Sequence, residues 1–384
     1  MNIVKKRGFY ALFLVALAVL AVGCYPSGSR SNLGWTVVSA QGNVVYGALP
    51  TGEVVALDSE EGGVELWAYP SQTQSGGSPV GCLVAQTKQD DTEMPLNAVY
   101  GAPVLTNGLV LFASYDGRLY AFDRDSGRLE WDFAVDDAII CSVAVREGTV
   151  YFGSSDHKVY ALDIDTQELV WDSPFETGDR VWGTPAVDAD NLYVGSMDHF
   201  VYAIDCQTGR EVWRVDIGAS VPGSIALAGD TLFVGGIDKR LHALDKKNGA
   251  EIWVTGDLEG WLWGEALVED GYVYFGSLGG KVYAVDVSNG AFRWEPATVD
   301  GALRAGPALL DGQLVVGTDV GGLYVIDKES GSAERLCSVD GAVLSTPAIV
   351  DGVIYVGTAK GNIYALDSSR RNPELWVYPH QEKK

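Results

Sequence analysis

The sequence is poor in the residues that build metal and redox sites. It contains 5 Cys and 4 His, with no Cys-x-x-Cys motif and no Cys/His cluster. Because zinc sites need several such ligands at short, defined spacings, the sequence excludes a zinc-stabilised domain. After Gly23, no long segment has the 3.6-residue hydrophobic period of an amphipathic helix. The absence of helical periodicity leaves an all-β fold as the expectation.

Positive charge is also scarce. The chain has 27 Lys and Arg residues against 51 Asp and Glu residues, which gives a net charge of −24. Nucleic acids and anionic membrane surfaces bind proteins through a positive face, so we expect neither as a partner. Such an acidic chain suits cations or the basic patches of other proteins, and its charge also favours solubility.

The N-terminus has the pattern of an export signal. Basic residues at 5–7 precede an apolar run over 9–22, which is shorter than the ~20 residues of a membrane-spanning helix. The run leads into Leu-Ala-Val-Gly-Cys24, which resembles the lipobox of bacterial lipoproteins, with Ala21 where Leu is usual. The alternatives are an ordinary secretory peptide with an incidental Cys and an uncleaved anchor.

This pattern predicts a lipoprotein signal peptide over 1–23, lipid attachment at Cys24 and a tether over 24–31. Acyl chains can anchor a folded domain at a membrane surface without a spanning helix. The predicted location is therefore outside the cytoplasm, either on the periplasmic side of an outer membrane or on the outer face of the cytoplasmic membrane.

What the chain has in abundance is a repeat. A tetrad of the Tyr-Ala-Leu-Asp type recurs eight times, and a Trp follows its Asp by eight or nine residues in every unit but the seventh, which has Arg335 instead. The tetrads end at Asp58, Asp123, Asp163, Asp205, Asp245, Asp286, Asp327 and Asp367. A fixed period of about 20–50 residues indicates a repeat architecture.

Each unit contains four short runs of β-branched and aromatic residues that are separated by turns, which is typical of a four-stranded antiparallel sheet. Eight such sheets hide both faces when they close radially. We predict an all-β, eight-bladed β-propeller of four-stranded antiparallel blades over 32–379, with an insertion over 71–98 between blades 1 and 2. The recurring Asp, Gly and Trp are then expected to build turns and to pack neighbouring blades together.

The motif Ala-x-Asp-x-x-Thr-Gly-x-x-x-Trp, present as Ala203 to Trp213, resembles the repeat of PQQ-like β-propellers, and the resemblance covers 32–379. One branch of that family, the quinoprotein dehydrogenases, binds PQQ and Ca²⁺ and often carries an adjacent Cys pair. No two Cys are adjacent here. A lipobox followed by eight such blades is similar to the other, cofactor-free branch of BamB-type envelope lipoproteins.

The resemblance implies a non-enzymatic, monomeric scaffold that binds protein partners in the cell envelope. The more specific expectation is a role in outer-membrane protein assembly. It implies no PQQ and no Ca²⁺. Two alternatives stay open: an extracytoplasmic ligand-binding sensor and a PQQ-dependent dehydrogenase.

Residues that depart from the repeat are the better functional candidates. Most units have a small residue just before the first strand, and the residue in front of it is large in four units: Tyr100, Trp182, Trp263 and Arg304. These four are predicted to ring the mouth of the central channel and to bind a partner segment or a small ligand, because aromatic and Arg side chains dominate binding energy. Alternatively, they fill the channel by packing on each other.

Two further features are predicted on the same face. Five positions before the small residue lie Asp136, Glu259, Asp300 and Asp340, which form either an acidic rim for a basic loop or Ca²⁺, or ordinary turns. The insertion is either a functional loop or a tolerated one. A disulfide from Cys82 to Cys141 would hold it over the channel, although Cys206 and Cys337 leave other pairings open.

Overall fold

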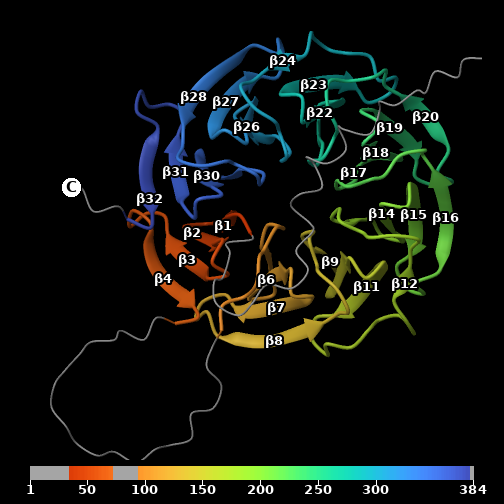
Figure 1. Ribbon diagram of the computed structural model, residues 1–384, viewed down its shortest axis with the longest axis horizontal. Coiled ribbons are helices and arrows are strands. Elements are labelled where there is room, and N and C mark those ends of the chain that lie inside the picture. The colour runs from red at the N-terminus through yellow and green to blue at the C-terminus, as the bar shows by residue number, and fades with distance from the viewer. Residues whose placement is uncertain (1–33, 72–93, 381–384) are drawn as a thin grey trace, which may run out of the picture. The chain divides into compact units, whose positions relative to one another are not determined.

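The computed structural model describes residues 34–71 and 94–380. They belong to one compact unit, Asn32–Lys384, in which eight four-stranded sheets follow one another around a central axis (Figure 1). None of the described residues forms a helix long and apolar enough to cross a membrane. The predicted signal peptide, Cys24, the tether, Cys82 and most of the insertion lie outside the described residues.

Each blade takes its four strands from one continuous stretch of chain. Blades 1 to 4 contain β1 (Val37–Gln41), β2 (Val44–Ala48), β3 (Val54–Asp58) and β4 (Val64–Tyr69); β5 (Val104–Thr106), β6 (Leu109–Ser114), β7 (Arg118–Asp123) and β8 (Leu129–Ala134); β9 (Ala144–Arg146), β10 (Thr149–Gly153), β11 (Lys158–Asp163) and β12 (Phe175–Glu176); β13 (Ala186–Val187), β14 (Asn191–Gly195), β15 (Phe200–Asp205) and β16 (Glu211–Asp216). Blades 5 to 8 contain β17 (Ala226–Ala228), β18 (Thr231–Gly235), β19 (Leu241–Asp245) and β20 (Glu251–Val254); β21 (Leu267–Glu269), β22 (Tyr272–Gly276), β23 (Lys281–Asp286) and β24 (Ala297–Thr298); β25 (Ala308–Leu310), β26 (Gln313–Gly317), β27 (Gly322–Asp327) and β28 (Ala333–Ser338); β29 (Ala348–Val350), β30 (Val353–Gly357), β31 (Ile363–Asp367) and β32 (Glu374–Tyr378). The predicted eight-bladed propeller is confirmed.

Both faces of each sheet are apolar, because every blade packs between two others. In β15, Val201 and Ala203 belong to the core shared with blade 5, whereas Tyr202 and Ile204 belong to the core shared with blade 3. Successive residues of a strand point to opposite faces, so this alternation fills two interfaces from one strand. The hydrophobic core is therefore a series of interfaces between blades around the axis.

The tetrad Asp makes the turn that the sequence predicts. In blade 4, Asp205 Oδ1 accepts hydrogen bonds from the backbone N–H groups of Gln207 and Thr208 and from the Thr208 hydroxyl, at 3.1, 2.8 and 2.8 Å. Bonds to the charged form lower the pKa of a carboxyl group, and the Thr208 hydroxyl is the main cause of the lowered pKa of Asp205. This recurring carboxylate is a structural element of the third turn.

The recurring Trp connects each blade to the next. Trp67 donates its indole N–H to the carbonyl of Arg124 at 2.9 Å, and its ring covers Gly127, where a Cβ would lie 2.5 Å from the ring. The same contacts join Trp171, Trp213, Trp253, Trp294 and Trp376 to Gly209, Gly249, Gly290, Gly331 and Gly63. The glycine thus supplies positive φ, as predicted, and also gives the Trp room.

Two junctions depart from this Trp–Gly pattern. Blade 3 has Gln167 in place of the glycine. The Gln167 side-chain amide donates to the Ile164 carbonyl at 3.3 Å. In the junctions that keep the pattern, the equivalent carbonyl accepts the indole N–H of the preceding blade's Trp, which here would be Trp131. In blade 7, Arg335 replaces the Trp and lies over the Tyr324 ring, 5.8 Å from its centroid. We call the pair of contacts, the indole hydrogen bond and the ring over the glycine, the Trp clamp. It occurs at six junctions between blades.

The ring closes by packing rather than by strand exchange. The first and last strands, β1 and β32, each pair within their own blade. Across the junction, Trp376 donates to the Ser59 carbonyl at 3.2 Å, and the Tyr378 hydroxyl donates to Glu65 at 2.7 Å. These two side-chain contacts therefore join the last blade to the first.

Candidate functional site

The site is a cavity of about 410 Å³ at the axis of the propeller. It is lined by the short segments that lead from the between-blade loops into the first strands. These segments are Trp35, 100–102, 140–143, 182–184, 222–224, 263–265, 304–306 and 344–346. The volume lies in the range of about 300–1,000 Å³ that is usual for ligand pockets.

All four residues predicted at the channel mouth line this cavity. Three of them form a ladder, in which the Trp182 and Trp263 rings are 6.2 Å apart and the Arg304 guanidinium lies 5.9 Å from the Trp263 centroid. Although the rings pack on each other, they leave the cavity open, so they do not fill the channel. The side chains are half-buried, with part of each surface free for a ligand.

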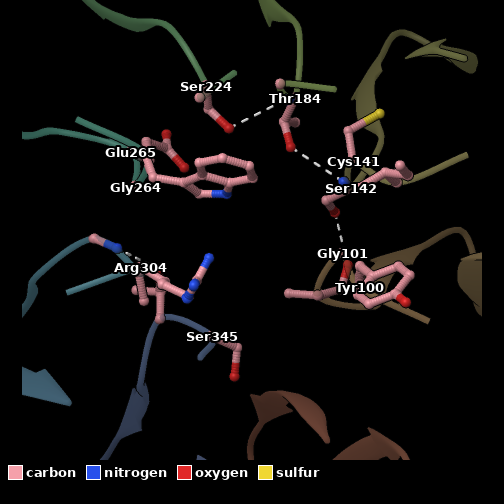
Figure 2. A pocket seen from close by; sticks show the side chains of 18 of the residues that line it. Tyr100, Gly101, Cys141, Ser142, Thr184, Ser224, Gly264, Glu265, Arg304 and Ser345 are labelled. Carbon is pink, nitrogen blue, oxygen red and sulfur yellow. Dashed lines mark hydrogen bonds between the residues drawn. The ribbon is translucent and has the colours of Figure 1, made fainter. Parts of the chain in front are cut away.

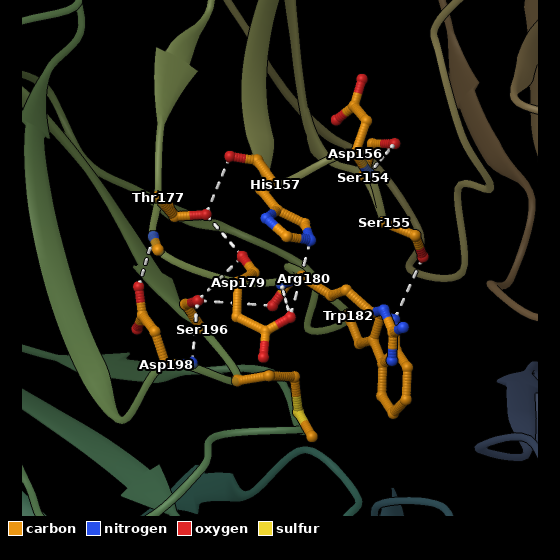
Figure 3. Close-up of polar contacts among 12 residues, drawn as sticks. Ser154, Ser155, Asp156, His157, Thr177, Asp179, Arg180, Trp182, Ser196 and Asp198 are labelled. Atoms are coloured by element: carbon orange, nitrogen blue, oxygen red, sulfur yellow. Dashed lines mark hydrogen bonds and ion pairs between the residues drawn. The ribbon is translucent and has the colours of Figure 1, made fainter.

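Trp182 is held in place from outside the cavity (Figure 3). Its indole N–H donates to the Ser155 hydroxyl at 3.1 Å, and the Arg180 guanidinium lies 5.8 Å from its ring centroid. Arg180 is exposed and forms no ion pair with the described part of the chain. The ladder Arg180–Trp182–Trp263–Arg304 is thus an ordered run of aromatic rings with a cation at each end.

Tyr100 lies across the cavity from Arg304 and Glu265 (Figure 2). It packs edge-on against Trp35 at 4.4 Å and against Tyr115 at 5.8 Å. Burial raises the pKa of Tyr100 to about 12, so its hydroxyl stays protonated at neutral pH. The cavity therefore has two separate aromatic walls.

Sequence reasoning missed a ring of hydroxyls one residue further along the chain. The hydroxyls of Thr184, Ser224 and Thr346 each accept the N–H of the equivalent segment in the preceding blade, at 3.1 Å, and the Ser142 hydroxyl donates to the Ala102 carbonyl at 2.6 Å. These bonds connect neighbouring blades at the axis. Aligning the position after the small residue across all eight units would have revealed the pattern.

Glu265 occupies this hydroxyl position in blade 6, and it was also missed. Its side chain lines the cavity and is exposed to solvent there. Desolvation by the protein around the cavity raises the pKa of the Glu265 carboxyl. The sequence signal for it is a charged residue at a position where the other units have Ser, Thr, Ala or Gly.

The four predicted rim carboxylates do not act as one group. Each forms an ion pair with a cation of the blade that follows it: Asp136 with Lys158 at 2.8 Å, Glu259 with Lys281 at 3.5 Å, Asp300 with Arg335 at 2.9 Å and Asp340 with Lys360 at 2.6 Å. Exposed pairs of this kind contribute about 0–1 kcal/mol each. Their charge is locally balanced, which weakens the prediction of an acidic surface for a basic partner.

The described cysteines are unbridged. Cys141 is buried at the edge of the cavity and donates its thiol to the Gly153 carbonyl at 3.4 Å, while Cys206 and Cys337 are also free. Cys141 is thus a free thiol, and Cys82, the disulfide partner considered for it, lies outside the described residues. Burial raises the pKa of Cys141 to about 11, which keeps the thiol protonated and unreactive.

The comparisons with known proteins agree on the fold. The family model described as outer membrane protein assembly factor BamB matches residues 51–179, 159–302 and 296–384. Among solved structures, the chain is similar to the computationally designed Ika8 protein, with 16% identity over 88% of this chain and 97% of that chain and a TM-score of 0.71. It is also similar to BamB from Moraxella catarrhalis, with 18% identity over 85% of this chain and 95% of that chain and a TM-score of 0.67.

At these identities the structural likeness shows the fold alone, and no curated protein matches the chain at a significant level. The family evidence comes instead from the three overlapping matches, which together span 51–384 and so most of the sequence. The chain belongs to the family of PQQ-like β-propellers described as outer membrane protein assembly factor BamB.

Proposed function

We propose that this protein is a non-enzymatic scaffold of the cell envelope and that it binds a protein partner on the propeller face that carries the cavity mouth. The observation that carries the proposal is the ladder Arg180–Trp182–Trp263–Arg304. Trp and Arg side chains contribute most of the energy at protein interfaces. The family's description supports outer-membrane protein assembly as the process served.

Other exposed apolar side chains extend the same face. Trp261, in the loop that leads to Trp263, is 38% exposed, and its carbonyl accepts the N–H of Leu278 in the neighbouring turn at 2.9 Å. Val320, in the equivalent turn of blade 7, is 59% exposed. Apolar side chains around an aromatic and Arg centre resemble the make-up of a protein-binding surface.

The described residues lack two features of the quinoprotein branch, an adjacent Cys pair and a group of metal ligands. Cys141 is the single described Cys in the cavity wall, and it is buried. Over 34–71 and 94–380, no three His, Cys, Asp or Glu side chains are grouped to hold a metal ion. We therefore propose a function without PQQ or Ca²⁺.

The lipobox supports attachment to a membrane through acyl chains on Cys24, with the propeller on the periplasmic side of the envelope. Replacing Cys24 with Ser is expected to move the protein from the membrane fraction to the soluble fraction, because a propeller with this acidic surface has little affinity of its own for lipid. Fractionation of cells that express either form measures this. Retention of Cys24→Ser in the membrane fraction would contradict the proposed anchor.

The scaffold role is tested by capturing partners from native membranes with tagged protein. Replacing both Trp182 and Trp263 with Ala is expected to abolish capture while the thermal unfolding profile stays close to that of the parent, because both rings are half-buried at the cavity. A matched control replaces Val212 and Ile252, each 49% exposed on the outer strands, with Ala. Capture that survives the Trp replacements, or that the control also abolishes, would argue against this face.

A further inference from the structure

The cavity wall carries one positive and one negative side chain, and neither forms an ion pair with a residue that the structure describes. Among the described residues that line the cavity, Arg304 and Glu265 are the charged ones. They come from adjacent blades. Four cations near the cavity face differ from Arg304 in having carboxylate partners: Lys158, Lys281, Arg335 and Lys360.

The fold does not explain Glu265. At its position Thr184, Ser224 and Thr346 connect neighbouring blades through their hydroxyls, and Glu265 makes no such bond. Glu265 lines the cavity and is exposed, so its carboxylate is open to a bound ligand, and partial desolvation raises its pKa. A carboxylate that lines the cavity and makes none of the bonds that the fold uses at this position is available to bind a ligand.

Arg304 also lines the cavity without an ion pair to any described residue. Its guanidinium lies 5.9 Å from the Trp263 centroid, which orients it without using its N–H donors. A guanidinium presents a planar fork that binds a carboxylate through two hydrogen bonds. The wall beside it is formed by Trp263 and Trp182, whose rings offer a flat apolar surface.

We propose that the central cavity binds a zwitterionic ligand of the amino-acid class. The ligand's carboxylate binds Arg304, its ammonium binds Glu265, and its apolar side group packs against Trp182 and Trp263. An amino acid or a short peptide fits a cavity of about 410 Å³. The ligand uses the Trp182, Trp263 and Arg304 side chains that the proposed partner surface also uses, but its binding is measured on the purified propeller without a partner, so the two proposals can fail separately.

Two sources offer this chemistry, and the probes distinguish them. L-phenylalanine carries both charges on its own termini. An N-acetylated, C-amidated Lys-Phe-Glu tripeptide carries them on side chains, as a chain segment would. Isothermal titration of the full propeller with each probe shows which source binds.

The charge assignments are tested by pairing variants with modified ligands. Arg304→Gln and Glu265→Gln are each expected to weaken binding of the better probe by about tenfold or more, the usual effect of losing a charge-assisted hydrogen bond. If L-phenylalanine is that probe, acetylation of its amine should weaken binding to the parent and to Arg304→Gln but have little further effect on Glu265→Gln. If the tripeptide is the better probe, replacing its Lys with norleucine should likewise weaken binding to the parent and to Arg304→Gln but have little further effect on Glu265→Gln.

Matched controls use exposed charges away from the cavity, Arg210→Gln and Glu60→Gln, which should leave binding unchanged. Absence of heat with either probe at millimolar concentration would overturn the proposal. So would binding that neither cavity variant weakens, or a ligand modification that affects all three proteins equally. Thermal unfolding of each variant identifies any loss that comes from misfolding.

Discussion

Trp376→Ala is expected to lower the free energy of unfolding by about 3–5 kcal/mol, the usual cost of removing a buried Trp side chain. Trp376 is 8% exposed, donates to the Ser59 carbonyl of blade 1 at 3.2 Å and covers Gly63. It lies at the junction between the last blade and the first, where no covalent connection crosses between the described strands. Denaturant titration measures this free energy. The transitions followed by fluorescence and by circular dichroism are compared to test whether unfolding is two-state.

Trp131→Ala is the matched control for this prediction. Trp131 occupies the same repeat position, but the facing residue is Gln167 instead of Gly, and the indole makes no clamp bond there. It is also less buried. Its replacement is expected to cost clearly less than that of Trp376, and an equal cost would mean that the clamp adds nothing beyond the area that a Trp buries.

The sequence was sufficient to predict the blades because the repeat residues act mostly within one unit. Asp205 and its turn, and the alternation of Val201 and Tyr202, follow from spacings of a few residues. The Trp67–Gly127 contact joins two blades across the long insertion. Recurrence shows that both residues matter, but only the folded ring shows that they touch.

The site was predicted in part for a similar reason. Tyr100, Trp182, Trp263 and Arg304 are visible as departures from the repeat, and their common cavity follows from the eightfold closure. Glu265 was missed because the position after the small residue was not compared across the units. The rim prediction was too simple because each carboxylate's partner, such as Lys158 for Asp136, comes from a strand of the following blade.

Gly127→Ala is expected to destabilise the protein more than Gly108→Ala, although both glycines have positive φ, at +69° and +77°. Adding a Cβ at such a φ costs roughly 1–2 kcal/mol by itself. At Gly108 the Cβ would meet nothing within 4 Å, whereas at Gly127 it would lie 2.5 Å from the Trp67 ring. Overpacking of this kind adds about 1–3 kcal/mol, so the difference between the two variants isolates the contact.

A double-mutant cycle decides whether that contact is the cause. In a Trp67→Ala background the ring that opposes the new Cβ is gone, so Gly127→Ala should cost no more than Gly108→Ala does. The free energies of unfolding of Trp67→Ala, Gly127→Ala and the double variant give the coupling directly. Strict additivity would contradict the clamp, because the two residues would then stabilise the ring independently. Strong non-additivity would show that a glycine is required at this turn for the neighbouring blade's Trp as well as for its own backbone angle.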